Sequence, residues 1–242
     1  MRWESHTDFS RFTIGRRELV LHRDIAPHAA TILQKLIALK SSDQPGAGNR
    51  QSAFRLNIEN GPELFARRAR RGGMIAALLD DVYVGMNPRP LQELAVAVAA
   101  KKRGIPVTES MGAMVEWIGP ALYRGFFLTR AVPGMTLWEF LQTDDDPTVR
   151  EHVLHRVRNA IDTMHRGGLH HADLNLHNLL VTTAGESFNA TIADLDKARL
   201  YDGPVPEAKR RENGRRLLRS AHKLDPAGKY LDEAGLAILN LD

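Results

Sequence analysis

One short segment of the chain concentrates polar side chains between a predicted helix and an apolar strand. The segment runs His170-His171-Ala172-Asp173-Leu174-Asn175-Leu176-His177-Asn178. Residues 179–181 follow it as a short β-like piece, and a second such piece, residues 191–193, leads directly into Asp194. A hairpin of these two strands would return Asp194 to the side of Asp173 and Asn178. The chain is therefore constrained to a fold in which a helix, a loop and a hairpin gather two carboxylates and an amide.

Phosphoryl transfer needs a set of oxygen ligands of this kind. One carboxylate accepts or orients the proton of the attacking hydroxyl, while an amide and a second carboxylate hold Mg²⁺ across the nucleotide phosphates. The five-residue offset from Asp173 to Asn178, followed by the strand-borne Asp194, matches the catalytic and metal loops of protein-kinase-like enzymes. The alternative is a turn in which Asp and Asn side chains cap backbone groups. That alternative accounts for a lone aspartate, but the ordered set favours the kinase interpretation.

The first half of the chain carries a predicted hairpin preceded by a glycine-containing loop. Residues 53–59 alternate with period two, as in a half-buried strand, and residues 63–67 return after a turn. Gly46 and Gly48 lie in the loop before the hairpin and are candidates for contacts with nucleotide phosphates. The third glycine position of such a loop falls on Gln51, so an ordinary flexible loop accounts for the pattern equally well.

Arg67 and Glu93 are the candidates for an ion pair at the nucleotide. A kinase N-lobe presents a strand cation to the α- and β-phosphates and a helix glutamate that pairs with this cation. No lysine occurs between Lys40 and Lys101, so the strand cation must be an arginine, and Arg67 ends the second strand of the hairpin. Glu93 lies on the helix predicted to follow Pro88 and Pro90. The alternative for each is an exposed surface ion.

Composition excludes several other classes. An apolar fraction of 43% is enough for a packed core, and the absence of cysteine excludes disulfide scaffolds, thiolate zinc sites and cysteine nucleophiles. No run of about 18 apolar residues occurs, so no membrane-spanning helix is predicted. The net charge of +4 is mild, and no nucleic-acid-binding motif is present, so we expect no nucleic-acid partner. The histidines around Asp173 fit no zinc spacing; we expect His171 to brace the loop through hydrogen bonds.

The predicted architecture is α+β with two lobes, similar to that of protein kinases. Residues 1–45 are treated as an N-terminal extension that contains a helix near residues 32–39. Residues 46–130 form a mostly β N-lobe with one helix, and residues 131–242 form a shortened helical C-lobe with the catalytic and metal loops. Within the C-lobe, a helix begins at Pro147 and a strongly basic last helix runs from about residue 207 to 223.

These motifs resemble those of the lipopolysaccharide-core sugar kinases, and among them most closely the 3-deoxy-D-manno-octulosonic acid (Kdo) kinases. The resemblance runs from about residue 46 to about residue 223. The matching pieces are His171-Ala172-Asp173-Leu174-Asn175 with His177-Asn178, Asp194-Leu195-Asp196-Lys197, Arg70-Arg71-Gly72-Gly73, and Asn213-Gly214-Arg215-Arg216-Leu217-Leu218-Arg219-Ser220.

The resemblance implies ATP-dependent phosphorylation of a Kdo hydroxyl on a lipid A or lipopolysaccharide inner-core precursor. Asp173 would be the catalytic base, Asn178 and Asp194 the Mg²⁺ ligands, and Arg67 the phosphate contact. The protein would act in the cytoplasm, peripherally on the cytoplasmic face of the inner membrane. Two alternatives stay open: a heptose or other small-molecule kinase of the same fold, and an inactive kinase-like scaffold that binds nucleotide.

The sequence departs from regulated protein kinases at two positions, and the first of them points to a small-molecule or glycolipid acceptor. The residue after His171 is Ala172, where such kinases carry the arginine that grips a phosphorylated activation loop. Asp196 stands where a glycine is usual, which makes a flipping metal loop less favourable. The basic last helix is either a solvated charged face or a surface that contacts lipid A phosphates or anionic headgroups.

Overall fold

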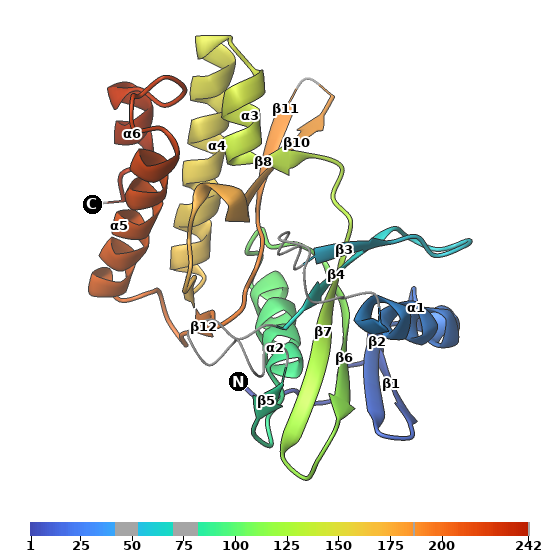
Figure 1. Ribbon diagram of the computed structural model, residues 1–242. Helices are drawn as coiled ribbons and strands as arrows, with labels where there is room; N and C mark the ends of the chain where they lie inside the picture. Colours follow the sequence, from blue (N-terminus) through green and yellow to red (C-terminus); the bar gives the residue numbers. More distant parts are fainter. Residues whose placement is uncertain (42–52, 70–81, 186, 242) are drawn as a thin grey trace. The chain divides into compact units, whose positions relative to one another are not determined.

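The computed structural model shows a chain of helices and antiparallel sheets (Figure 1). The described residues are 1–41, 53–69, 82–185 and 187–241. The predicted α+β class is confirmed. The chain forms two compact units, Met1–Ala95 with Glu109–Ala131 and Val96–Thr108 with Val132–Asp242, and the helix α2 (Arg89–Lys102) contributes residues to both.

The first unit is built on one antiparallel sheet. Its strands are β1 (Phe9–Ile14), β2 (Arg17–His22), β3 (Ala53–Leu56), β4 (Leu64–Arg68), β5 (Tyr83–Val84), β6 (Ser110–Trp117) and β7 (Leu122–Arg130). They lie in the order β1-β2-β6-β7-β4-β3, and β5 pairs with β7. The predicted hairpin is present as β3 and β4, in which Ala53 pairs with Arg67. Because side chains alternate along a strand, Arg67 lies on the opposite face of β4 from the fully buried Leu64 and Ala66.

The first 41 residues belong to this unit. They form β1, β2, the short helix η1 (Ala26–His28) and α1 (Ala29–Ser41), and β2 pairs with β6 along its length. Ile32 and Leu36 of α1 are fully buried in one apolar cluster with Leu19 of β2 and Leu128 of β7. The segment treated above as an N-terminal extension thus adds two strands and a covering helix to the sheet.

The helix α2 positions Glu93. At its start, the Arg89 N–H donates to the Tyr123 hydroxyl on β7 at 3.1 Å, and the N–H groups of Leu91 and Gln92 donate to the Pro88 carbonyl oxygen. A Cβ atom at Gly125 of β7 would lie 2.7 Å from the Pro90 ring, so only glycine allows this close approach of helix and strand.

The second unit is mostly helical. Its helices are α3 (Leu137–Thr143), α4 (Pro147–Arg166), η3 (Leu176–Asn178), α5 (Glu207–Leu224) and α6 (Glu233–Leu239), and its strands are β8 (Met135–Thr136), β9 (Leu169–His170), β10 (Leu179–Ala184), β11 (Ser187–Ile192) and β12 (Arg199–Leu200). The Asp146 carboxylate caps α4 by accepting from the Thr148 N–H at 2.8 Å, which explains why this helix begins at Pro147. Strands β11, β10 and β8 form one antiparallel sheet, and β12 and β9 form another.

None of the helices in the described ranges combines the length and apolar character that crossing a lipid bilayer requires.

Candidate active site

The loop between β9 and η3 is held by the buried ring of His171. Its Nδ1 accepts a hydrogen bond from the Asp173 N–H at 3.1 Å, and its Nε2 lies 2.9 Å from the Ala193 carbonyl oxygen. The ring is therefore the Nε2–H tautomer, since Nδ1 is used as an acceptor. Complete burial lowers the pKa of His171, which keeps the imidazole neutral. The expected bracing role is confirmed: one ring joins the Asp173 loop to the strand end that precedes Asp194.

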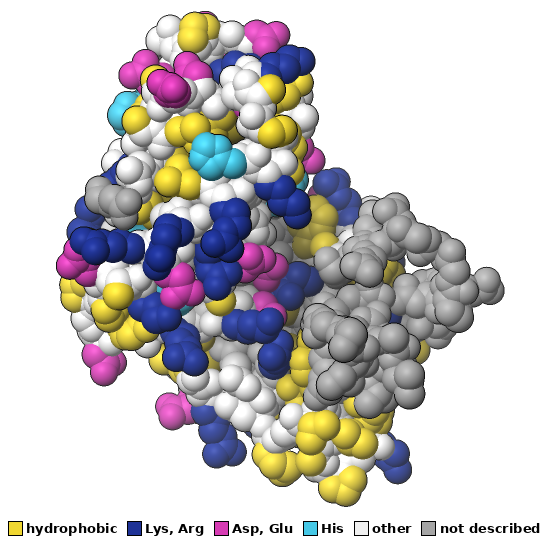
Figure 2. Space-filling model, turned by 60° about the vertical axis from the view of Figure 1, so that its left-hand side comes forward, with side chains coloured by type: hydrophobic (Ala, Val, Ile, Leu, Met, Phe, Trp, Pro, Cys, Tyr) yellow, Lys and Arg dark blue, Asp and Glu magenta, His cyan; other side chains and the backbone are white. Residues whose placement is uncertain are grey.

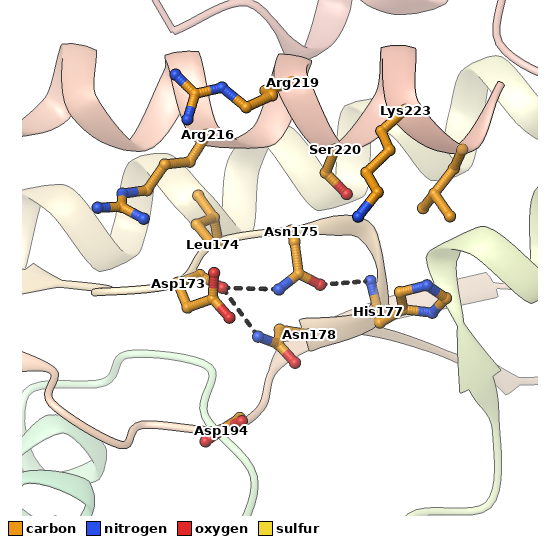
Figure 3. A pocket seen from close by; sticks show the side chains of 11 residues that line it. Asp173, Leu174, Asn175, His177, Asn178, Asp194, Arg216, Arg219, Ser220 and Lys223 are labelled. Atoms are coloured by element: carbon orange, nitrogen blue, oxygen red, sulfur yellow. Dashed lines mark hydrogen bonds between the residues drawn. The ribbon is translucent and has the colours of Figure 1, made fainter. Parts of the chain in front are cut away.

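Two asparagines clamp the backbone of Asp173. The Nδ2 groups of Asn175 and Asn178 each donate to the Asp173 carbonyl oxygen at 2.9 Å (Figure 3). Asn175 also caps η3, because its Oδ1 accepts from the His177 N–H at 2.9 Å. These bonds use the main chain of Asp173 and leave its carboxylate to face the pocket described below.

Asp194 reaches the same place through strand register. Leu179 of β10 pairs with Ile192 of β11, and one residue further the Ala193 N–H donates to the Asn178 carbonyl oxygen at 2.9 Å. Asp194 has a left-handed backbone with φ of 57°. For a residue other than glycine this conformation costs on the order of 1 kcal/mol, and such residues concentrate at functional sites.

These side chains line a pocket of about 430 Å³ (Figure 3). Its lining residues are Asp173, Leu174, Asn175, His177, Asn178, Asp194, Arg216, Arg219, Ser220, Lys223 and Leu224. The volume lies in the range of pockets that hold small organic ligands, roughly 300–1,000 Å³. The fold therefore brings together the three residues, Asp173, Asn178 and Asp194, that the sequence pattern singled out in this half of the chain.

In the first unit, Arg67 and Glu93 form the expected ion pair. Arg67 Nη2 donates to Glu93 Oε2. The Glu93 side chain is 5% exposed and that of Arg67 is 22% exposed, so the alternative of two solvated surface ions is wrong. Gly46 and Gly48 lie outside the described residues, as does the segment Arg70–Gly73.

A sequence model of the lipopolysaccharide kinase (Kdo/WaaP) family matches residues 47–232. This range includes both the Arg67–Glu93 pair and the whole Asp173 loop with Asp194. The chain belongs to this family.

Two relatives and one solved structure illustrate the similarity to this kinase family. The chain is 33% identical over 181 residues to a 3-deoxy-D-manno-octulosonic acid kinase of Xylella fastidiosa, an alignment that covers 73% of this chain and 68% of the relative. It is 27% identical over 160 residues to the enzyme of the same name from Vibrio cholerae, covering 65% and 64% of the two chains. The structure of WaaP in complex with acyl carrier protein superposes with a TM-score of 0.59 at 17% identity, over 91% of this chain and 86% of that one. At 17% identity, this structural similarity shows that the two proteins share a fold.

The pocket also contains residues that the sequence pattern did not place beside Asp173. Arg216, Arg219 and Lys223 of α5 line the pocket together with Ser220, whose Oγ accepts from the Leu176 N–H at 3.3 Å. The signal for them is the spacing i, i+3, i+4 and i+7, which places four side chains on one stripe of a helix. The sequence shows that the helix is basic, but only the structure shows that this stripe lines the same pocket as Asp173.

Asn213, which does not line the pocket, attaches α5 to the loop of Asp173. It is fully buried, its Nδ2 donates to the His171 carbonyl oxygen at 2.5 Å, and its Oδ1 lies 3.1 Å from His165 Nε2. Because Nδ2 is the donor, Oδ1 must accept from the His165 Nε2–H. Burial lowers the pKa of His165, consistent with a neutral ring that donates one hydrogen bond.

Proposed function

We propose that the protein transfers the γ-phosphoryl group of ATP to a hydroxyl of a Kdo sugar on a lipid A or lipopolysaccharide inner-core precursor. One observation carries the proposal: Asp173, Asn178 and Asp194 line a single pocket in a chain of the lipopolysaccharide kinase family. The relatives named above are 3-deoxy-D-manno-octulosonic acid kinases, and this name gives the acceptor sugar of the proposal.

Asp173 would act as the catalytic base. Its carboxylate accepts the proton of the sugar hydroxyl as the hydroxyl oxygen attacks the γ-phosphorus, and the bond from this phosphorus to the bridging oxygen breaks to release ADP. The chain contributes orientation: His171 fixes the Asp173 N–H, and Asn175 and Asn178 fix its carbonyl oxygen. Three hydrogen bonds hold the main chain of Asp173 in place, which limits the positions open to its carboxylate and lowers the entropic part of the barrier.

The donor set at Asn178 and Asp194 fits a magnesium ion. Asn178 uses Nδ2 in its bond to Asp173, so its Oδ1 is available as a ligand, and Asp194 supplies carboxylate oxygen. Among the described residues no three His, Asp or Glu side chains converge as a complete metal cage. Kinase sites commonly hold Mg²⁺ with one or two protein oxygens and complete the shell with substrate phosphates and water. When bound, the ion supplies neutralisation of charge on the transferring phosphate.

Arg67 would contact the nucleotide phosphates, with Glu93 fixing the guanidinium through the buried ion pair. The planar guanidinium can keep one edge on a carboxylate while another edge binds a phosphate oxygen. A nucleotide contact through Gly46 and Gly48 stays a prediction from the sequence.

The test is purified protein with radiolabelled ATP and a panel of acceptors: lipid A precursors with Kdo, without Kdo, and with heptose added. We expect Mg²⁺-dependent label only in Kdo-bearing acceptors, with mass spectrometry locating the new phosphate on Kdo. The Asp173→Asn variant should bind nucleotide like the wild type but lose activity by about 10²–10⁴-fold. As a matched control, Asp202→Asn alters an exposed aspartate outside the pocket and should keep full activity.

Three results would contradict the proposal. Phosphate on heptose would identify a different sugar kinase, nucleotide binding without turnover would indicate a scaffold, and full activity of Asp173→Asn would remove the assigned base.

We further propose that the protein works peripherally at the cytoplasmic face of the inner membrane. Figure 2, which turns the side of α5 and α6 toward the viewer, shows Lys and Arg side chains gathered across this face. Arg211 and Arg215, one turn apart on α5, are both exposed. Cations near an anionic surface contribute about 1 kcal/mol each to binding. The fraction of protein that sediments with vesicles containing anionic lipid should fall when Arg211→Gln and Arg215→Gln are combined, and it should fall as salt is added. Binding that neither the double variant nor salt weakens would contradict the proposal.

A further inference from the structure

The pocket around Asp173 has a cationic wall that the mechanism above does not use. Arg216, Arg219, Ser220 and Lys223 project from one stripe of α5 into the pocket lining. In Figure 3 the loop that carries Asp173 and Asn175 lies between α5 and Asp194. The proposed metal ligands therefore lie on one side of this loop and the three cations on the other.

Among the described residues, few acceptors use the hydrogen-bond donors of this wall. Arg216 Nη2 lies 3.2 Å from Glu212 Oε1, while its Nε is buried without an acceptor among the described residues. Within the same described ranges, Arg219 and Lys223 make no ion pair with a carboxylate. An arginine Nε–H that is buried without an acceptor costs free energy unless a ligand supplies one. The wall thus offers several donors and positive charges to an anion.

Glu212 does not neutralise this wall. Hydrogen bonds from Lys209 and Arg216 lower the pKa of Glu212 to about 2, so it is ionised, and its charge is shared with Lys209 on the outer side of the helix. Because Glu212 pairs with both Lys209 and Arg216, its one negative charge does not balance the three cations of the wall, which keeps a net positive charge. Of these three cations, Glu212 contacts only Arg216.

We propose that Arg216, Arg219 and Lys223 form a subsite that binds the carboxylate of the acid sugar while its hydroxyl faces Asp173. This inference rests on the proposed function and specifies how its acceptor is recognised. An octulosonic acid carries a carboxylate, whereas a neutral hexose or heptose does not. Guanidinium groups bind carboxylates through paired N–H donors, and an ammonium adds a point charge. A site that provides donors for an acid group rejects a neutral analogue because those donors would then be left unpaired.

The position of the wall relative to Asp173 and Asp194 also indicates which of the two substrates, the nucleotide or the acceptor sugar, it would contact. As the proposed base, Asp173 would contact the acceptor hydroxyl, and Asn178 with Asp194 would hold the metal ion at the nucleotide. Cations on the side of the loop away from Asp194 therefore meet the acceptor rather than the nucleotide. The subsite consequently predicts a selective effect on acceptor binding.

The experiment compares two acceptors that differ only at this group: a Kdo-bearing lipid A precursor and its methyl ester at the Kdo carboxyl. For the wild type, we expect the ester to have a KM at least about tenfold higher, the loss of one charge-assisted interaction. The variants Arg219→Gln and Lys223→Gln should raise the KM of the acid acceptor by a similar factor. The KM for ATP should stay unchanged, and the preference for acid over ester should shrink. Lys223→Arg, which keeps the charge, should restore much of this preference.

Arg210→Gln provides the control for net charge. Arg210 is an exposed cation on the same helix and does not line the pocket, so this variant should behave as the wild type with both acceptors. A Kdo acceptor whose lipid A phosphates have been removed distinguishes the Kdo carboxylate from those phosphates as the anion that the wall binds. We expect Arg219→Gln and Lys223→Gln to raise the KM of this acceptor by the same factor as that of the phosphorylated one.

The outcomes distinguish the two proposals. Transfer to Kdo by the wild type, with Arg219→Gln and Lys223→Gln indistinguishable from it, would overturn the subsite and leave the function standing. Variants that lose their effect once the lipid A phosphates are removed would assign the wall to those phosphates and overturn the carboxylate assignment. Failure of the wild type to phosphorylate any Kdo acceptor would overturn the proposed function and the subsite with it.

Discussion

The side chain of Asn213 donates a hydrogen bond to the backbone carbonyl of His171, at 2.5 Å, across 42 positions of the sequence. Both residues are fully buried. The contact joins α5 to the loop of Asp173, so the helix that carries the cationic wall and the loop that carries the proposed base are held together by one amide group.

Replacing Asn213 with Leu should destabilise the second unit. The substitution keeps an isosteric side chain but leaves the His165 Nε2–H and the His171 carbonyl buried without partners, and each such group costs about 1–3 kcal/mol. We expect a lower free energy of unfolding in urea and reduced protection of the His171 loop in hydrogen exchange. Arg210→Gln on the same helix serves as the matched control; equal stability of the two variants would show that the Asn213 bonds carry no net stabilisation.

Acid should destabilise the folded protein. Burial lowers the pKa values of His165, His170 and His171 below the ordinary histidine value of about 6.5. Below that pH the unfolded chain binds protons that the folded chain does not. The contribution of these histidines to the free energy of unfolding is therefore fully present above about pH 6.5 and is lost as the pH falls. Each histidine contributes a slope of up to about 1.4 kcal/mol per pH unit.

Urea denaturation between neutral and mildly acidic pH measures this slope. The variant His165→Gln removes one of the three titrations, and we expect a shallower loss of stability with acid, whatever its stability at neutral pH. An identical slope in both proteins would show that His165 does not contribute.

The Arg67–Glu93 pair should show strong energetic coupling. Glu93 is 5% exposed, and desolvated ion pairs interact more strongly than exposed ones because water screens them less. A double-mutant cycle with Arg67→Met and Glu93→Gln should give a coupling of about 1–3 kcal/mol in urea denaturation. The pair Arg55–Glu63, with side chains 63% and 40% exposed, provides the control, for which we expect about 0.5 kcal/mol or less. Equal coupling in the two pairs would contradict the prediction.

Asp194→Asn should separate metal binding from folding. Asparagine adopts the left-handed backbone as readily as aspartate, so the φ of 57° is preserved and the melting temperature should stay within about 2 °C of the wild type. The loss of a charged oxygen ligand should raise the Mg²⁺ concentration that gives half-maximal activity by about tenfold or more. An unchanged Mg²⁺ requirement would remove Asp194 from the metal site.

Local patterns predicted much of the fold. The period of two in residues 53–59 and 63–67 predicted the β3–β4 hairpin, and Pro147 predicted the first residue of α4. Both elements form through contacts between residues near one another in the sequence, such as the Asp146 cap, and local contacts leave a local signal.

The same holds for the core of the candidate site. The offset between Asp173 and Asn178 is set within one turn of chain, and the β10–β11 hairpin carries Asp194 back through its own register. Sequence order alone therefore predicted that these three side chains would meet.

Only the tertiary structure decided what surrounds them. That β2 pairs with β6, so that the first residues complete the sheet, depends on contacts between residues 91–99 positions apart in sequence. That Asn213 lies under His171, and that Arg216, Arg219 and Lys223 face the Asp173 pocket instead of solvent, depends on how α5 rotates as Leu217 and Ala221 become buried. A basic helix has the same composition whichever stripe it buries, and its packing against the loop decides which of its cations line the pocket.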